Sequence, residues 1–278
     1  MSTTEIPTPS EPTARTSAAT LVRHDEGGVA TVRINRPEAF NALDRPTKEA
    51  LVSTLRAVAE DPEVRVVVLT GTGKSFCAGE DLRAHAGNLL SGEQTLANTI
   101  DDHYNPIAET LATMDKPVIA AINGIAAGAG VAFALAADFR IMTDDGGMNL
   151  AFAGIALSCD SGASFWLPRI IGMAKAKEIL LMPRTLRAAE CESLGLVTRV
   201  VPREAFDAAV AELATTLAAG PTRAYGAMRR ALAFSATHDL AESLKHERDL
   251  MDSTGRTADH LAAVQAFVAK QPPTFSGR

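Results

Sequence analysis

Two glycine-rich segments contain the residue types that could hold a reacting group close to the backbone. The first, GTGKSFCAGEDL (residues 71–82), follows the apolar run VRVVVL, and the second, NGIAAGAG (residues 123–130), follows VIAAI and opens a helical pattern. The second segment has no acid, base or nucleophile, so its reactive groups are backbone amides. An N–H in the first turn of a helix favours negative charge. If the segments converge, they present two N–H donors to one oxygen, which is an oxyanion hole.

Two other kinds of glycine-rich site do not fit these segments. A phosphate loop needs G-x-x-x-x-G-K-[ST] and a dinucleotide fingerprint needs G-x-G-x-x-G, and neither spacing occurs in either segment. Either segment taken alone could instead be structural, with its glycines forming a tight left-handed turn or a close packing contact.

The elements that would position these segments follow an alternation of strand and helix patterns. Residues 20–37 predict a hairpin that turns at Gly27 and Gly28. Asp44 predicts the cap of the next helix. Residues 64–71 form a continuous β-branched run, which predicts a strand covered on both faces. The predicted fold class is therefore α/β.

The strand signal nearly disappears after residue 173, and apart from residues 196–201 the rest predicts successive helices. We predict three parts. Residues 1–19 are rich in Ser, Thr and Pro and predict a disordered tail. Residues 20–203 predict an α/β core, and residues 204–278 predict a helical C-terminal module, to which the resemblance described below assigns a role in oligomerisation.

Composition narrows the class of protein. The chain has 278 residues, of which 46% are hydrophobic, enough for a sizeable core. Its formal net charge of −6 gives little support to nucleic-acid binding. Its three cysteines are widely spaced and its histidines form no H-x-x-x-H pair, so we expect no metal site. Residues 117–137 are uncharged, but Asn123 and Gly124 interrupt them, so we expect a cytoplasmic protein without a membrane span.

Four segments, in this order along the chain, are similar to those of the enoyl-CoA hydratase/isomerase (crotonase) superfamily. They are RINRPEAFNAL, KSFCAGEDL, KPVIAAINGIAAGAGVAFALAADFRI and LPRIIGMAKAKEILLMPRTLRAAECESLGLVTRVVP. The resemblance covers about residues 20–278. It implies a crotonase-like spiral of ββα units with a C-terminal helical trimerisation module, and a homotrimer or hexamer. It also implies an acyl-CoA thioester substrate, with no metal or redox cofactor and with coenzyme A only as part of the substrate.

In that family, two backbone N–H groups hold the thioester carbonyl. By motif, the resemblance assigns them to Glu80, in AGEDL, and Ala129, in AGAG. Ala129 is small enough for the carbonyl to approach the backbone. For Glu80 we expect the N–H alone to act, with the side chain turned away in a surface role. Ala78 and Leu82 flank the first donor and would give main-chain contacts to the adenine and pantetheine of coenzyme A.

The resemblance also places the two catalytic glutamates of family hydratases at Ala132 and Phe152, so both carboxylates are missing here. Without them, water addition lacks its usual acid and base. Asp160, in GIALSCDSGASFWLP, is the carboxylate that remains nearby. Its segment is similar to that of the branch typified by the epoxyphenylacetyl-CoA isomerases of phenylacetate catabolism. Cys159 and Ala163 depart from the PDSGG pattern of that branch.

Asp160 has two interpretations. From spacing alone, an aspartate followed by Ser-Gly predicts a helix N-cap. The resemblance favours a catalytic base, and the two roles could coexist. Apolar neighbours such as Leu157 and Trp166 would desolvate the carboxylate and raise its pKa. A single base above an enolate can then take a proton from one carbon and return it to another.

The family supplies an aromatic residue and a lysine to the CoA nucleotide from a C-terminal helix, often across a subunit boundary. AFVAK places Phe267 and Lys270 three residues apart on one face of a predicted helix. The pattern alone favours a core phenylalanine and a solvated lysine. The resemblance makes them the residues that bind the nucleotide.

We therefore expect an acyl-CoA enzyme that shifts a double bond, or isomerises a ring-activated acyl-CoA, through an enolate. The N–H groups of Glu80 and Ala129 would hold the oxygen, and Asp160 would shuttle the proton. Two alternatives stay open. One is an enoyl-CoA hydratase in which Asp160 works with an unidentified second acid, and the other is a non-catalytic acyl-CoA-binding homologue.

Overall fold

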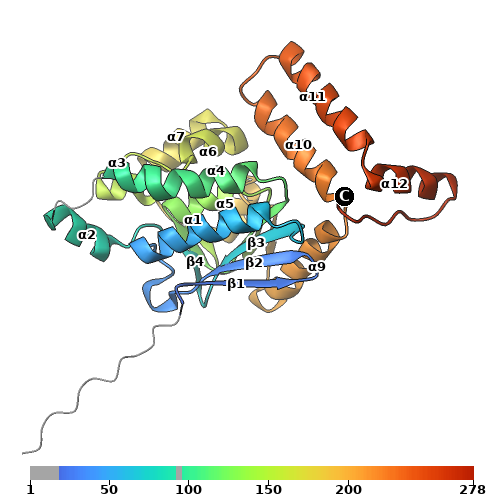
Figure 1. Ribbon diagram of the computed structural model, residues 1–278. Coiled ribbons are helices and arrows are strands. Elements are labelled where there is room, and N and C mark those ends of the chain that lie inside the picture. The colour runs from blue at the N-terminus through green and yellow to red at the C-terminus, as the bar shows by residue number, and fades with distance from the viewer. Residues whose placement is uncertain (1–18, 92–95) are drawn as a thin grey trace, which may run out of the picture.

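The computed structural model describes residues 19–91 and 96–278, so the predicted tail lies outside the described residues except for residue 19. The described chain forms two sheets with helices packed around them (Figure 1). The larger sheet has the strands β1 (Leu21–Glu26), β2 (Val29–Ile34), β3 (Val66–Gly71), β5 (Val118–Ile122), β7 (Phe139–Thr143) and β10 (Arg199–Val201), in that order. The smaller sheet has the strands β4 (Ser75–Cys77), β6 (Ile125–Ala127), β8 (Gly147–Asn149) and β9 (Leu186–Arg187). The predicted α/β class is confirmed.

The larger sheet forms where the sequence patterns are strong. β1 and β2 are antiparallel and turn at Gly27 and Gly28, as predicted. β3 is buried along its whole length and pairs in parallel with β2 on one side and β5 on the other. A parallel strand covered on both faces needs no alternation, which is why its sequence is continuously apolar.

The smaller sheet was not predicted. β4 and β6 lie within the two glycine-rich segments that we predicted as turns directly after the long strands. Each is three residues long, too short for a recognisable alternation. The Asn123 side chain holds the crossing between the sheets, because its Nδ2 donates to the carbonyls of Gly71 and Gly73 at 2.9 Å each.

Helices cover the sheets and make up most of the C-terminal part of the chain. They are α1 (Arg45–Glu60), α2 (Leu82–Ser91), α3 (Leu96–Thr99), a π-helical turn (Ile100–Tyr104), α4 (Asn105–Thr113), α5 (Ala129–Ala136), α6 (Ala163–Ile171), α7 (Met173–Leu181), α8 (Ala188–Ser193), α9 (Phe206–Ala218), α10 (Thr222–Ser235), α11 (Leu240–Gly255) and α12 (Ala258–Val268). Asp44 caps α1 as expected, since its carboxylate accepts the Thr47 N–H at 3.0 Å.

The C-terminal segment divides into two kinds of helix. α9 packs on the larger sheet, where Phe206 and Leu217 join a core cluster with Val66 and Ile119. α10 contacts α4, whereas α11 and α12 extend away from the body (Figure 1). The predicted boundary at residue 203 therefore assigns α9 to the C-terminal module, although α9 packs on the sheet of the α/β core.

No helix in the described ranges is long and apolar enough to cross a bilayer. Residues 117–137, which have the length and composition of a span, are divided between β5, β6 and α5 in the interior.

Candidate active site

The two glycine-rich segments converge because β4 and β6 are paired in parallel. Parallel strands end at the same edge of a sheet, so the residues after Cys77 and after Ala127 emerge side by side. Gly79 has a φ of +82°, and a Cβ there would lie 2.9 Å from the carbonyl oxygen of Ala127 and 3.4 Å from the amide nitrogen of Ala129. Only glycine permits that approach in that conformation.

In the part of the chain that the structure describes, the amide N–H groups of Glu80 and Ala129 have no backbone acceptor. Glu80 is the centre of a parallel bridge with Leu43, in which Leu43 N–H donates to the Gly79 carbonyl and Asp81 N–H donates to the Leu43 carbonyl. The N–H of Glu80 itself therefore points away from Leu43. Ala129 is the first residue of α5, and its N–H has no partner within that helix. Within the described ranges, neither N–H donates to a backbone carbonyl.

A cavity of about 130 Å³ lies in front of these two turns. Glu80 and Ala129 form part of its wall, and Asp160 forms another part. Most of the remaining wall is apolar and includes Leu96, Ile100, Phe152, Ile155 and Leu157. The structure thus brings the predicted donors and the predicted base to one apolar cavity.

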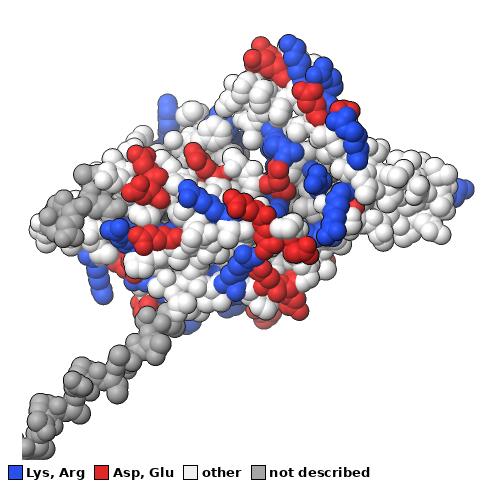
Figure 2. All heavy atoms as spheres, viewed as in Figure 1, with Lys and Arg blue, Asp and Glu red and all other residues white. Residues whose placement is uncertain are grey.

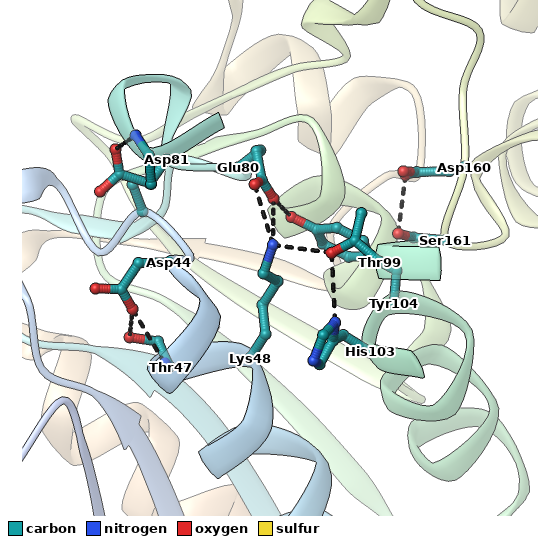
Figure 3. Close-up of polar contacts among 12 residues, drawn as sticks. Asp44, Thr47, Lys48, Glu80, Asp81, Thr99, His103, Tyr104, Asp160 and Ser161 are labelled. Carbon is teal, nitrogen blue, oxygen red and sulfur yellow. Dashed lines mark hydrogen bonds and ion pairs between the residues drawn. The ribbon is translucent and has the colours of Figure 1, made fainter. Parts of the chain in front are cut away.

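Asp160 does not cap a helix. α6 begins after Gly162, whose φ is +81°, and no side chain caps it. The Asp160 carboxylate instead accepts a hydrogen bond from the Ser161 hydroxyl at 2.9 Å (Figure 3). The N-cap interpretation is therefore wrong, and the carboxylate is available to the cavity.

Burial raises the pKa of the Asp160 carboxyl above its ordinary value, and the charge of Glu80 adds to the effect, while the Ser161 hydrogen bond opposes it. Burial favours the neutral form because a low-dielectric surrounding disfavours the charge. A carboxylate with a raised pKa is a stronger base than an exposed one, as abstraction of a proton from carbon requires.

Replacing Asp160 with asparagine should make the folded protein more stable at neutral pH. Because the pKa of Asp160 is raised on folding, the folded state holds the proton more tightly, so stability falls as pH rises from the unfolded to the folded pKa. Asp160→Asn removes this loss. The difference in free energy of unfolding between Asp160→Asn and wild type, measured in urea, should shrink as pH falls towards the ordinary carboxyl pKa of about 3.9. A variant less stable than wild type at pH 7 would contradict a raised pKa.

The Glu80 side chain is not at the surface, which corrects our expectation. Its carboxylate accepts hydrogen bonds from Lys48 Nζ at 3.0 Å to each oxygen, and a third from the Tyr104 hydroxyl (Figure 3). Lys48 is 2% exposed, Tyr104 3% and the Glu80 side chain 19%. Sequence reasoning missed these partners, although Lys48 stands at helical spacing with the buried Leu51 and Leu55 of α1, and a lysine within an apolar stripe is a signal.

The positions of the missing hydratase carboxylates are apolar. Phe152 lines the cavity, and Ala132 is fully buried within α5. Ala78 and Leu82 line the cavity beside the first turn, with the Ala78 N–H already bound to the Phe40 carbonyl at 3.2 Å. Only the carbonyl of Ala78 is therefore available for the main-chain contact that we predict.

Phe267 and Lys270 do not reach the cavity of their own chain. α12 ends at Val268, and Lys270 follows it with a φ of +55°, so the two residues do not share a helix face as we expected. Phe267 is 83% exposed rather than part of a core. In Figure 1, α12 lies at the opposite end of the molecule from α2 and α3, and Figure 2 shows few charged side chains over it.

The fold places the two turns and the Asp160 carboxylate at one cavity, and comparison with known proteins shows the family to which the chain belongs. A family profile described as enoyl-CoA hydratase/isomerase matches residues 24–278. The chain belongs to the enoyl-CoA hydratase/isomerase (crotonase) family and is an acyl-CoA enzyme. The resemblance seen in the sequence is confirmed.

Individual relatives agree in fold but differ in the reaction that they are named for. The chain is 35% identical over 258 residues to the 1,2-epoxyphenylacetyl-CoA isomerase of Escherichia coli (strain K12), covering 93% of this chain and 98% of that one. It is 37% identical over 251 residues to a "probable enoyl-CoA hydratase" of Rhodobacter capsulatus, covering 90% and 95%. The crystal structure of the enoyl-CoA hydratase from Bacillus anthracis matches with a TM-score of 0.86 at 31% identity, covering 93% and 100%.

Proposed function

We propose that this enzyme is an isomerase that shifts a double bond in an enoyl-CoA, or isomerises a ring-activated acyl-CoA, with Asp160 as its single base. The observation that carries the proposal is the pairing of the Asp160 carboxylate with the amide N–H groups of Glu80 and Ala129 in a largely apolar cavity. The apolar residues Ala132 and Phe152, at the positions of the hydratase glutamates, support an isomerase over a hydratase.

The geometry supports a two-step proton shuttle. The Asp160 carboxylate takes a proton from C2 of a 3-enoyl thioester, and the electron pair moves to the thioester oxygen to give a dienolate. The N–H groups of Glu80 and Ala129 stabilise that oxygen more as it becomes an anion. The protonated Asp160 then returns the proton to C4, which leaves the double bond between C2 and C3. Neither water nor a second carboxylate takes part.

A hydratase is the second candidate, because Glu80 supplies a second carboxylate beside the cavity. A carboxylate has about four acceptor positions, and Lys48 and Tyr104 occupy three of those of Glu80. Glu80 is thus badly placed to orient and activate water, which favours the isomerase.

Two substrates distinguish the candidates. Purified protein is incubated separately with a 3-enoyl-CoA and a 2-enoyl-CoA. Absorbance of the conjugated thioester reports isomerisation, and the mass of the product reports hydration. The isomerase converts the 3-enoyl-CoA to the 2-enoyl-CoA without a change in mass. Gain of one water by the 2-enoyl-CoA would establish the hydratase instead. A protein that binds both thioesters but exchanges no α-proton with D₂O would be the non-catalytic homologue.

The nucleotide end of the substrate is proposed to be held by Phe267 and Lys270 of a neighbouring subunit in a homotrimer or hexamer. Apolar side chains exposed along α10, α11 and α12 support such an assembly; they include Met228, Leu232, Leu244, Met251, Leu261 and Val264. Large exposed apolar surfaces mark interaction sites. Light scattering on the purified protein gives the subunit number directly.

Lys270→Ala should raise the KM for an acyl-CoA about fivefold to tenfold and leave kcat unchanged, because a lysine–phosphate contact contributes roughly 1–1.5 kcal/mol. The matched control is the same acyl group on pantetheine, which lacks the nucleotide. The effect of Lys270→Ala should disappear with that substrate. An equal loss with both substrates would show that Lys270 acts on the fold or the assembly rather than on the nucleotide.

A further inference from the structure

A buried polar cluster connects three elements around the first amide donor. It consists of Lys48 from α1, Glu80, Thr99 from α3, and His103 and Tyr104 from the π-helical turn (Figure 3). Lys48 Nζ donates to both Glu80 oxygens and to the Thr99 hydroxyl, each at 3.0 Å. The Thr99 hydroxyl lies 3.3 Å from His103 Nδ1. All three protons of the Lys48 ammonium are therefore used.

Stability alone does not account for this cluster. Burying an ammonium and a carboxylate costs desolvation free energy, and apolar residues of similar volume are often as stable or more stable in the same place. Lys48 is nevertheless 2% exposed, in a helix stripe whose other members are mostly apolar. The burial of Lys48 is better explained by the group that Lys48 holds in place.

The group that it holds is the peptide of Glu80. Glu80 lies in an irregular segment between β4 and α2, directly after Gly79 with its φ of +82°. The backbone contacts with Leu43 fix this segment on one side only. On the other side, Glu80 is fixed by its side chain, which Lys48 and Tyr104 hold with three hydrogen bonds. Fixing both sides sets the direction of the N–H.

We propose that Lys48 is a positioning residue that, through the Glu80 carboxylate, aims the Glu80 amide N–H at the thioester oxygen of the substrate. The inference rests on the proposed function only in taking that N–H as an oxyanion donor. Because Tyr104 and Thr99 also line the cavity, the same cluster fixes the wall against which the acyl group packs. A donor held rigidly costs no reorganisation when charge develops on the oxygen.

The test measures the carbonyl itself as well as turnover. The carbonyl stretch of carbonyl-labelled butyryl-CoA, which has no double bond to shift, is recorded by infrared spectroscopy when bound to the full-length protein. Hydrogen bonding in an oxyanion hole lowers that frequency. We compare wild type with Lys48→Met, Glu80→Gln and the double variant. The matched control is Lys116→Met, which removes a buried lysine that binds the Val58 carbonyl outside the cavity.

Lys48→Met should lose most of the frequency shift and lower kcat for a 3-enoyl-CoA about 10- to 100-fold, with KM changed less than threefold, as expected for a misdirected donor. If Lys48 acts through Glu80, the double variant should be no worse than Lys48→Met. Lys116→Met should keep both the shift and kcat. A full shift in Lys48→Met, or multiplicative losses of kcat in the double variant, would overturn the inference.

Two further outcomes are decisive. If Lys48→Met does not fold, Tyr104→Phe removes a single anchor of the same carboxylate and should reduce the shift; an unchanged shift would overturn the inference. If wild type shows the shift and Lys48→Met loses it, but neither protein isomerises the 3-enoyl-CoA, the positioning role is supported while the proposed reaction fails.

Discussion

Asp160→Asn lowers kcat for a 3-enoyl-CoA by about 10²- to 10⁴-fold, the range expected when a general base is removed. Asparagine has nearly the same shape as the neutral acid but cannot take a proton from carbon. KM should change little, since the proposed site holds the thioester oxygen with Glu80 and Ala129 rather than with Asp160. Steady-state rates, followed by absorbance of the conjugated thioester, measure both constants.

The control for this result is the stability of the Asp160→Asn variant. Because Asp160→Asn should be at least as stable as wild type at pH 7, loss of activity cannot be assigned to unfolding. A kcat within tenfold of wild type would show that another group is the base. His85, which lines the same cavity, would then be the next residue to replace.

Ala129→Pro should lower kcat/KM by about 10²- to 10³-fold, equivalent to roughly 2.7–4 kcal/mol, because it removes one oxyanion donor. Ala129 is the first residue of α5, a position where proline is tolerated because its missing N–H has no partner in the helix. The helix should therefore form while the donor is lost.

Two controls separate the donor from other effects of Ala129→Pro. Met173→Pro makes the same change at the first residue of α7, which also follows a glycine at the N-cap, and should keep wild-type activity. Ala129→Val adds bulk but keeps the N–H, so it should lose less activity than proline. Equal losses in the valine and proline variants would mean that crowding, not the missing donor, explains the result.

The sequence predicts the parts of this fold whose patterns are local. The hairpin at residues 20–37, the Asp44 cap and the buried strand β3 each depend on neighbours within a few residues, and the structure has all three. The three-residue strands β4 and β6 depend on pairing with each other, about 50 residues apart in sequence, so no local pattern marks them.

The candidate site shows the same division. Glu80, Ala129 and Asp160 were found because their motifs are contiguous, and the structure places all three at one cavity. The Glu80 side chain was misplaced because its partner Lys48 is 32 residues away on α1, and only packing brings them together. Phe267 and Lys270 were misplaced for a local reason, since α12 ends at Val268, two residues before Lys270.

The most direct test of a one-base isomerase uses a 3-enoyl-CoA carrying deuterium at C2, incubated with the enzyme in oxygen-18 water. The product is examined by mass spectrometry and by NMR of C4, with Asp160→Asn as the comparison. We predict a 2-enoyl-CoA without oxygen-18, part of the deuterium moved from C2 to C4, and no such transfer by Asp160→Asn. Oxygen-18 bound at C3, or deuterium transfer that survives in Asp160→Asn, would contradict the shuttle by Asp160.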